Sequence, residues 1–462
     1  MDGKQVSAEE LKQAMATDID QLVQEVAAAM NAAQAGRIIA DTEEVVREAH
    51  GVFREQAYNK AIGLLQEKQE ASSPRPEGCR NQGKQQTSHL TVNGRVSVCR
   101  TVYWSAQEGT VIPTDQWLGL TEHRVSPGVR EMCCRTALHC SFEVASDNLQ
   151  RTAQLSLAGR RLREVVENEG RAVLQAQQKG TLRPAFTVAD CTDQTVIVGA
   201  DGVMVPMVTE EQKQKRRQTE AAKRAEQGRS STVGVGRPPL GSDGPYKEFK
   251  LATFYDPDKS HCHVVATSGN HEVCGRILRR EARRLHLAEA QVKYGLSDAA
   301  EWILHQCARQ LPMLETHILD YRHARDHVIK ASHVLYEEGT DPAVQWREEM
   351  ISCLWEQGPL VLLDRLGPYL EQHRSGAQHE ALKSLRDFVV KHAAMMDYPR
   401  FRQLGYDCGS GPTESLCGTL TDRLKGPGMR WDKPNAEAMM ALACVYRSGL
   451  WDIYWKSERA AA

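Results

Sequence analysis

The chain has 462 residues, of which 41% are hydrophobic and 26% are charged, and its formal net charge is −2. This length supports two to four domains and excludes a single small domain. Gly and Pro, at 34 and 18 residues, occur at ordinary levels, which excludes a collagen-like or wholly disordered chain. No apolar run is as long as the roughly 18 residues of a membrane span, so we expect no membrane partner.

The beginning of the chain, MDGKQVSAEELKQ, lacks the basic and apolar order of a secretory signal. We therefore expect a cytoplasmic protein whose 13 cysteines are free thiols.

Charge is uneven along the chain. Residues 1–70 carry 7 Lys and Arg against 13 Asp and Glu, whereas residues 71–180 carry 14 against 10. A basic block of this kind fits a polyanionic partner, and it fits a solvated helix face equally well.

Residues 1–70 predict a helical N-terminal region. A capping-box pattern at Ser7 and Glu10 precedes apolar residues at helical spacing, which indicates two long helices. We expect this region to serve in assembly.

Residues 71–120 predict a linker followed by a β-hairpin. The stretch 71–86 is rich in Pro, Gly and polar residues, which breaks the preceding helix. Two alternating runs then meet at Asn93-Gly94, a dipeptide that tolerates positive φ and favours a hairpin turn.

Residues 121–180 predict three helices, the last of them rich in arginine. This order resembles a helix-turn-helix DNA-binding region, in which one helix enters the major groove. An ordinary helical triplet gives the same pattern. If the region binds DNA, the arginines expected to contact it are Arg151, Arg160, Arg161 and Arg163.

Residues 181–320 change to the strand period. The run 195–208 is rich in β-branched residues, as a buried central strand is, and the charged, Gly- and Pro-rich stretch 209–245 is expected to be a mobile insertion. The order strand, strand, strand, helix, strand, helix, strand indicates an α/β, RNase H-like catalytic core. Residues 321–404 predict an all-helical insertion, and residues 405–462 a C-terminal catalytic helix region.

Three carboxylates occupy suggestive positions in this order. Asp201 lies within the first strand, Asp298 follows the fourth, and Glu414 lies near the start of a late helix. An ionised carboxylate in an apolar strand is costly unless it is paired or bound to a cation. Two Mg²⁺ ions held by such groups can support phosphodiester displacement. The alternative is that Asp201 begins an Asp-Gly turn and that Asp298 and Glu414 cap helices.

Four segments resemble bacterial insertion-sequence transposases of the ISKra type. The longest is GSGPTESLCGTLTDRLKGPGMRWDKPNAEAMMALACVYRSGLWDIYW, at 409–455, and the others are VGADGVMVP, LSDAAEWI and LDYRHARDH, in the same chain order. The resemblance implies a DDE transposase that cleaves and joins DNA strands at the ends of an insertion sequence. Asp201, Asp298 and Glu414 would be its catalytic and metal-binding residues.

The resemblance also implies cofactors and partners. It implies Mg²⁺, with Mn²⁺ as a substitute, double-stranded DNA, a nucleoid-associated location, and a homodimer or higher synaptic oligomer. Asp320 and His323 match a signature after the last strand and would be supporting residues; a helix cap and a surface histidine are the alternative. The cations that would hold DNA after Glu414 are Arg423, Lys425 and Arg430.

The sequence departs from these relatives in two places. Cys79 and Cys99 are the only cysteines where relatives have a zinc ribbon, so we expect no structural zinc. Ala299 replaces a usual glycine after Asp298. His261 and His263 share a strand face, but no third ligand is evident in the sequence, which favours cross-strand packing.

Two other functions fit the same sequence. One is a catalytically silent DNA-binding regulator derived from a transposase, and the other is a different RNase H-like nuclease. An intact acidic triad argues against the first, and a recognition helix in 121–180 argues against the second.

Overall fold

The computed structural model describes residues 5–72, 75–120, 124–228, 241–372 and 375–461 and shows a mixed α/β protein with two sheets. The chain forms two compact units, Met1–Glu169 with Asp452–Ala462, and Gly170–Trp451. No helix among the described residues has the length and apolar character needed to cross a membrane. All 13 cysteines are free thiols, as predicted.

The first unit begins with the two predicted long helices, α1 (Ala8–Ala32) and α2 (Ile38–Ser72). The capping box at the start of α1 is confirmed. The Glu10 N–H donates to Ser7 Oγ at 3.2 Å, and the Ser7 N–H donates back to Glu10 Oε2 at 2.8 Å. These two bonds satisfy donors that the first turn of a helix otherwise leaves open.

The predicted hairpin is confirmed, with two corrections. It consists of β1 (Arg80–Thr91) and β2 (Gly94–Ser105), followed by β3 (Gly109–Val111) and α3 (Pro113–Leu118). The expectation of a linker over 71–86 is wrong in its second half, because β1 starts at Arg80. At the turn, Gly94 alone of the predicted dipeptide has a positive φ, at 109°.

The three helices expected in 121–180 are present. They are α4 (Pro127–Ala137), α5 (Phe142–Ala153) and α6 (Gly159–Lys179), and α4 and α5 are each capped by a serine hydroxyl. The last helix of the chain, α17 (Trp451–Ala461), also belongs largely to the first unit.

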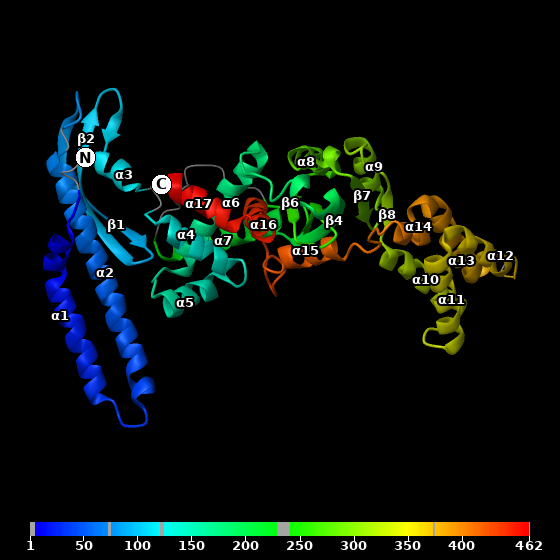
Figure 1. Ribbon diagram of the computed structural model, residues 1–462, viewed down its shortest axis with the longest axis horizontal. Helices are drawn as coiled ribbons and strands as arrows, with labels where there is room; N and C mark the ends of the chain where they lie inside the picture. The colour runs from blue at the N-terminus through cyan, green and yellow to red at the C-terminus, as the bar shows by residue number, and fades with distance from the viewer. Residues whose placement is uncertain (1–4, 73–74, 121–123, 229–240, 373–374, 462) are drawn as a thin grey trace. The chain divides into compact units, whose positions relative to one another are not determined.

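The second unit is built on a five-stranded sheet with the order β6-β5-β4-β7-β8 (Figure 1). Its strands are β4 (Thr195–Pro206), β5 (Tyr246–Tyr255), β6 (Cys262–Thr267), β7 (Val292–Ser297) and β8 (His317–Leu319). The pairs β4–β5 and β5–β6 are antiparallel, whereas β4–β7 and β7–β8 are parallel. The element order predicted for residues 195–319 is therefore confirmed, with β4 central.

Alternate residues of β4 face different helices. Val196 and Val198 pack with α8 (His271–Arg284), and Ala200 packs with α9 (Glu301–Gln310). Gly199 and Asp201, which alternate with them, face α15 (Gly411–Thr421), which lies on the other side of the sheet in Figure 1. Asp201 therefore lies on the α15 face, and the Asp-Gly turn considered for it is wrong because residues 201 and 202 are both in the strand.

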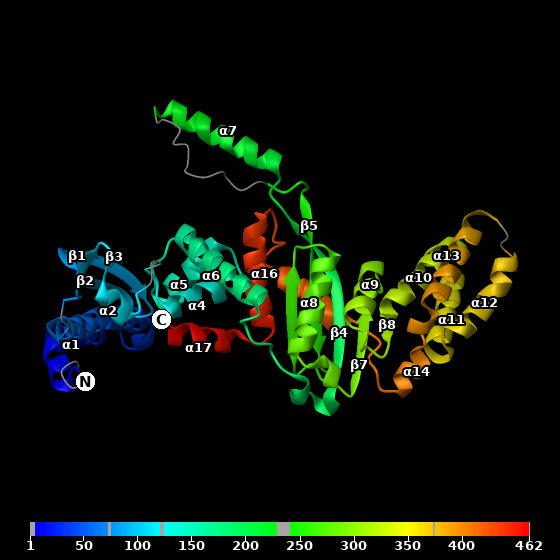
Figure 2. The same cartoon turned by 90° about the horizontal axis from the view of Figure 1, so that it is seen from above.

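The insertion predicted to be mobile over 209–245 is partly a helix. Glu210–Glu226 forms α7, capped by Thr209 and Gln212, and Lys213 Nζ lies 2.8 Å from Asp432 Oδ1. Figure 2 shows α7 extending away from the sheet. The high charge of this segment predicts a mobile chain, but the capping box and this ion pair hold the first turns of the helix in place. Residues 229–240 of the same prediction lie outside the described residues.

The helical insertion predicted for 321–404 is confirmed. It contains α10 (Tyr321–Leu335), α11 (Asp341–Gln357), α12 (Pro359–Gln372), α13 (Gly376–His392) and α14 (Tyr398–Gln403). These helices share an apolar core with β7 and β8. After α15, the chain continues into α16 (Lys433–Arg447), whose residues 438–445 are all buried.

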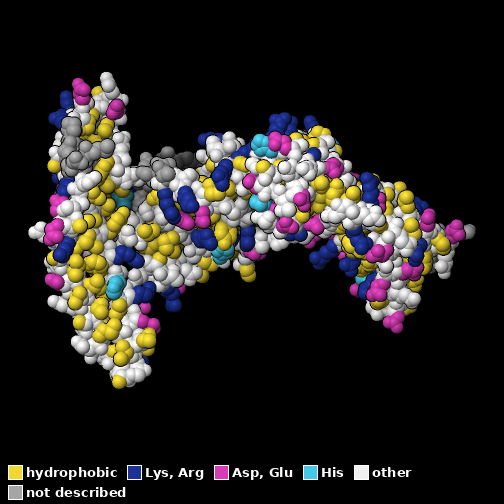
Figure 3. All heavy atoms as spheres, viewed as in Figure 1, with side chains coloured by type: hydrophobic (Ala, Val, Ile, Leu, Met, Phe, Trp, Pro, Cys, Tyr) yellow, Lys and Arg dark blue, Asp and Glu magenta, His cyan; other side chains and the backbone are white. Residues whose placement is uncertain are grey.

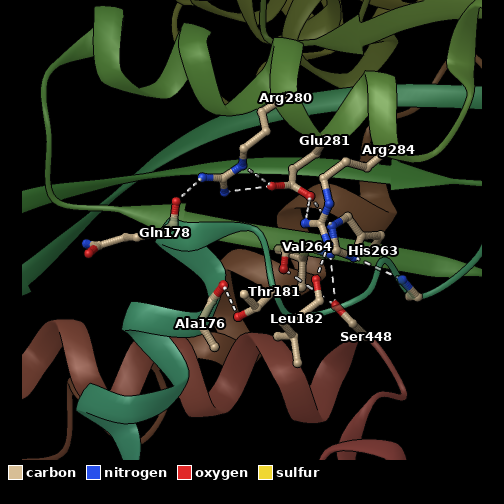
Figure 4. A network of polar contacts seen from close by, with 11 residues as sticks. Ala176, Gln178, Thr181, Leu182, His263, Val264, Arg280, Glu281, Arg284 and Ser448 are labelled. Carbon is tan, nitrogen blue, oxygen red and sulfur yellow. Dashed lines mark hydrogen bonds and ion pairs between the residues drawn. The ribbon is translucent and has the colours of Figure 1, made fainter.

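A buried charge network joins α8 to β6 (Figure 4). Glu281 is fully buried; its carboxylate accepts bonds from Arg280 Nε at 2.6 Å and Arg284 Nη1 at 2.7 Å and lies 3.2 Å from His263 Nε2. Arg280 and Arg284 also donate to the backbone oxygens of Gln178 and Leu182. The network therefore ties α8 to the end of α6 and to the segment that follows it.

Candidate functional site

Asp298 lies near Asp201, as the register of the parallel strands β4 and β7 leads one to expect. Residues of β4 and β7 that pair differ by 97 in number, as in Ile197 with Tyr294, and Asp201 and Asp298 differ by the same 97. Asp298 follows β7 directly, and its Oδ1 accepts a bond from the Ala300 N–H at 3.0 Å. Asp201 thus lies in the middle of β4, whereas Asp298 lies just beyond the end of β7, where it accepts a local turn bond and does not cap α9.

Helix α15 is held against β4 by small residues. Thr413 Oγ1 lies 2.8 Å from Thr253 Oγ1 of β5, and a Cβ added to Gly199 would lie only 2.1 Å from Thr413 Oγ1. The helix can approach this closely only because position 199 lacks a side chain. Glu414 is the next residue, in the first turn of α15, and its side chain is 48% exposed.

Asp201 contacts the same helix through Cys417, one turn after Glu414. The Cys417 thiol donates to Asp201 Oδ2 at 3.1 Å, and the Gly202 N–H donates to Oδ1 at 2.6 Å. Burial raises the pKa of Asp201, and the Asp298 carboxylate raises it further. Burial and the neighbouring Asp201 also raise the pKa of Cys417. Asp201 is thus a carboxylate whose charged form the fold disfavours.

Asp320 is linked to Glu414 through Ser410. Asp320 is 2% exposed and caps α10, where its Oδ1 accepts the His323 N–H at 2.9 Å. Its other oxygen accepts both the N–H and the hydroxyl of Ser410, and Ser410 Oγ lies 3.3 Å from Glu414 Oε1. The helix-cap alternative for Asp320 is therefore confirmed, and the same carboxylate also fixes the start of α15.

His323 is placed differently from Asp320. Its ring packs near His327 and Phe388, with centroid distances of 5.2 and 6.4 Å, and it meets Asp320 through its backbone N–H. The side chain of His323 therefore belongs to the interface between α10 and α13.

The three predicted acids share one region, but their ligand atoms are not assembled around a point. Among the described residues, the group of three or more potential ligands whose atoms all lie within 4.8 Å of one another is Cys191, Asp256 and His261. Asp201, Asp298 and Glu414 are wider apart than that. The acids lie on the elements that the sequence predicts for them, and their side chains would have to move closer to hold one ion.

The cations expected to hold DNA after Glu414 divide into two kinds. Lys425 and Arg430 are exposed. Arg423 is 8% exposed, its guanidinium lies 4.9 Å from the Trp431 ring, and Nη1 lies 2.7 Å from Met429 Sδ. This geometry fits a role in packing the 425–430 loop rather than the predicted DNA contact.

Of the four arginines expected to contact DNA in the first unit, Arg151, Arg160 and Arg163 are exposed and Arg161 is half-buried. Arg151 pairs with Asp147, Arg160 and Arg161 pair with Glu164, and Arg163 pairs with Glu167, all within a helical turn. The exposed pairs with Asp147 and Glu164 are weak, so they leave these guanidinium groups able to exchange partners, whereas Glu167, the partner of Arg163, is buried.

Sequence reasoning missed several residues of this region. Cys417 and Ser410 have a recognisable signal, because they stand three residues after and four residues before Glu414 in a small-residue helix. Glu248 has none. Its carboxylate lies where a Cβ of Gly202 would point, and it forms an ion pair with Lys250, which also lies 5.1 Å from the Trp302 ring.

The interpretation of His261 and His263 as a packing pair is wrong for His261. His263 is buried against Glu281, whereas His261 Nδ1 lies 2.8 Å from Asp256 Oδ2 and close to Cys191. A carboxylate and a thiol thus accompany His261. Cys191 is 70 residues earlier in the chain, so the sequence gives no sign of this grouping. Trp431, Trp451 and Trp455 are buried in the core, and Trp302 is half-buried.

Comparison with known proteins gives one partial match. The chain is 32% identical over 98 residues to the UPF0236 protein in the vanSb 3′ region of Streptococcus gallolyticus. The match covers 21% of this chain and 21% of that protein. No family model matches the chain.

Proposed function

We propose that the chain is a DNA transposase with an RNase H-like catalytic domain, which cleaves and joins phosphodiester bonds by a DDE mechanism. The strand order supports this proposal, because three antiparallel strands followed by two parallel ones is the arrangement of an RNase H-like sheet. The observation that carries the proposal is that Asp298, directly after β7, lies near enough to Asp201 of the adjacent β4 for its charge to act on it, with the helix of Glu414 docked over Gly199.

The donor set in this region fits Mg²⁺ or Mn²⁺. All three acids offer carboxylate oxygens, which these hard cations prefer. Among the described residues, no Lys or Arg forms an ion pair with Asp201, and burial raises its pKa, so a cation there would offset an unfavourable charge. When bound, two such ions activate an attacking oxygen and stabilise the leaving oxygen. The protein would hold them through Asp201, Asp298 and Glu414.

The residues around the three acids would orient the acidic side chains and would take no part in the chemical step. Asp320 and Ser410 fix the first turn of α15 and thereby the origin of the Glu414 side chain. Cys417 orients the Asp201 carboxylate through the hydrogen bond that its thiol donates to Oδ2. Neither the thiol nor a covalent protein intermediate is needed for strand cleavage.

A groove between α7 and the 425–430 loop extends the proposed DNA surface. Lys215, Arg216 and Arg430 line an open hollow of about 530 Å³ together with Gly428. Lys425 lies near enough to Cys417, the thiol that contacts Asp201, for its charge to act on that thiol. Phosphates held by these residues would bring a DNA strand toward Asp201.

We also propose that two or more copies assemble on DNA, since both ends of an element must be brought together. Several large apolar side chains on α1 and α2 are exposed, and Figure 3 shows apolar atoms over these helices. They include Ile19, Val23, Met30, Ile39 and Val52. Light scattering of the parent and of Val23→Glu tests this: the proposal expects a multimer that the substitution dissociates.

A cleavage assay tests the function. The probe is a supercoiled plasmid that carries the chain's own coding sequence with its flanking DNA, incubated with purified full-length protein and Mg²⁺. We expect nicking near the flanks by the parent and a loss of at least about 1,000-fold in Asp201→Asn, Asp298→Asn or Glu414→Gln. Asp364→Asn is the matched control, because Asp364 is an exposed acid of the helical insertion.

The alternatives give different results in the same assay. Binding of the flanking DNA without cleavage would support a silent regulator. Cleavage without preference for the flanking DNA would support another nuclease. Equal cleavage by the parent and Asp201→Asn would end the proposal.

A further inference from the structure

A second cluster of potential ligands lies at the end of the sheet where β4 begins. Cys191 precedes β4, Asp256 follows β5, and His261 precedes β6. One donor atom from each lies within 4.8 Å of the other two. Tyr255 pairs with Ile197, so Asp256 is level with a position five residues before Asp201, or roughly 16 Å along the strand. This cluster is therefore separate from the proposed catalytic acids.

We propose that Cys191, Asp256 and His261 bind one zinc ion. A thiolate, a carboxylate and an imidazole are all ordinary zinc ligands, whereas Mg²⁺ prefers oxygen atoms alone. Bonds of about 2.0–2.3 Å place tetrahedral ligands roughly 3.3–3.8 Å apart. Ligand atoms that already lie within 4.8 Å of one another need to shift by only about 1 Å.

The charge of Asp256 supports a bound cation. This residue is fully buried, and its ion-pairing partner among the described residues is His261, which carries a charge only when protonated. The Ser260 hydroxyl at 2.5 Å and the His261 N–H at 3.0 Å satisfy some of its acceptor capacity. Hydrogen bonds from neutral groups compensate a buried carboxylate less well than a cation does.

The ligands are held in place before any ion binds. The β5–β6 loop is closed by the bond from the Asp256 N–H to the His261 oxygen at 3.3 Å. On the other side, the Cys191 N–H donates to the Val188 oxygen at 3.1 Å, next to a capping box between Thr187 and Asp190. Because these loops are already ordered, little entropy is lost on binding.

The surroundings leave an entry path and suggest a structural role. The His261 side chain is 34% exposed, so water can occupy a fourth position on the ion. Cys191 and Asp256 are 65 residues apart in the sequence. The ion would therefore join the segment before β4 to the β5–β6 hairpin and stabilise this end of the sheet.

Metal titration of the full-length protein tests the site. Protein stripped with a chelator is titrated with Zn²⁺ against a chromophoric competitor, and with Co²⁺ to detect thiolate-to-metal absorption. We expect one high-affinity equivalent for each chain. His261→Gln should weaken zinc binding at least about 10-fold, and Cys191→Ser should also abolish the Co²⁺ thiolate band.

The controls separate this site from a folding defect and from the catalytic acids. Cys262→Ser and His286→Gln change a neighbouring thiol and an exposed histidine, and both should bind zinc like the parent. His261→Gln changes a partly exposed loop side chain, so it keeps the test open if Cys191→Ser does not fold. Asp201→Asn should keep the zinc equivalent even if it abolishes cleavage. Absence of zinc binding by the parent, or unchanged affinity in His261→Gln, would overturn the proposal.

Discussion

Asp201 and Glu281 are both acidic residues of the same α/β layer, and their surroundings are opposite. Glu281 is fully buried and is surrounded by Arg280, Arg284 and His263. Although burial acts to raise it, these partners lower the pKa of Glu281 to about 2. Asp201 accepts bonds from a thiol and a backbone N–H, and burial raises its pKa.

Glu281 therefore stabilises the fold, whereas the ionised form of Asp201 is unfavourable in it. The cations around Glu281 also bond backbone oxygens, so they are committed to the structure. Lys425, whose charge acts on the Cys417 thiol that contacts Asp201, is exposed and can bind a phosphate. An unfavourable carboxylate beside exposed cations is typical of a functional site.

The largest effect on stability is expected from Glu281→Gln. Two cations would lose their buried partner, so we expect a loss of roughly 3–5 kcal/mol in the free energy of unfolding, measured by urea denaturation at pH 7. Because the folded pKa of about 2 lies below the unfolded value of 4.5, this stabilisation is present above pH 4.5 and is lost as the pH falls toward 2. Glu289→Gln, at an exposed acid, should change little. A Glu281→Gln protein as stable as the parent would show that this network does not stabilise the fold.

A smaller effect is expected when the cations of the groove are neutralised. Lys215→Gln combined with Arg216→Gln should weaken binding to a DNA duplex roughly 10-fold near 100 mM salt and reduce the salt slope by about 2. Fluorescence anisotropy across a salt series measures both quantities. Lys383→Gln on α13 is the control, and an unchanged slope in the double variant would remove α7 from the DNA surface.

Asp201→Asn should stabilise the protein. The amide removes a charge that burial disfavours, so we expect a gain on the order of 1 kcal/mol at pH 7. The folded pKa of Asp201 is raised, so its penalty applies above that pKa and disappears as the pH falls. Thermal unfolding should therefore show that Asp201→Asn is more stable than the parent at pH 7, and that this difference in stability is smaller at pH 4. Destabilisation at pH 7 would place Asp201 with Glu281 as a structural acid.

The smallest effect is expected from Ala299→Gly. Ala299 has a φ of +57°, a left-handed conformation that favours glycine, but its methyl group is buried. The relief of strain and the loss of burial nearly cancel, so we expect a change within about 1 kcal/mol and unchanged cleavage. A larger loss of stability would show that packing of the methyl group outweighs the strain.

The sequence predicts much of the architecture, because periodicity and turn residues act locally. The two N-terminal helices, the hairpin, the order of strands and helices along residues 195–319, and the helical insertion follow from such patterns. The helix α7 does not, because its sequence is polar on all sides and it is anchored by contacts distant in the chain, such as Lys213 with Asp432.

For the candidate site, the sequence predicts which strand or helix carries each acid, but it does not predict which side chains contact one another. The strand position of Asp201 and the helix position of Glu414 follow from the sequence. Burial of Arg423 against Trp431 depends on tertiary packing, which no local pattern encodes. The grouping of Cys191 with Asp256 and His261 likewise requires three segments to meet in space.

The most direct test of the catalytic proposal is a metal-preference switch at Asp201. Asp201→Cys replaces an oxygen ligand with sulfur, which Mg²⁺ binds poorly and Mn²⁺ accepts more readily. Plasmid cleavage is measured with each ion for the parent, Asp201→Cys and Asp201→Ala. If Asp201 is a metal ligand, Asp201→Cys should be inactive with Mg²⁺ and regain activity with Mn²⁺, and Asp201→Ala should be inactive with both. Cleavage by Asp201→Cys in Mg²⁺ at the parent's rate would contradict the account.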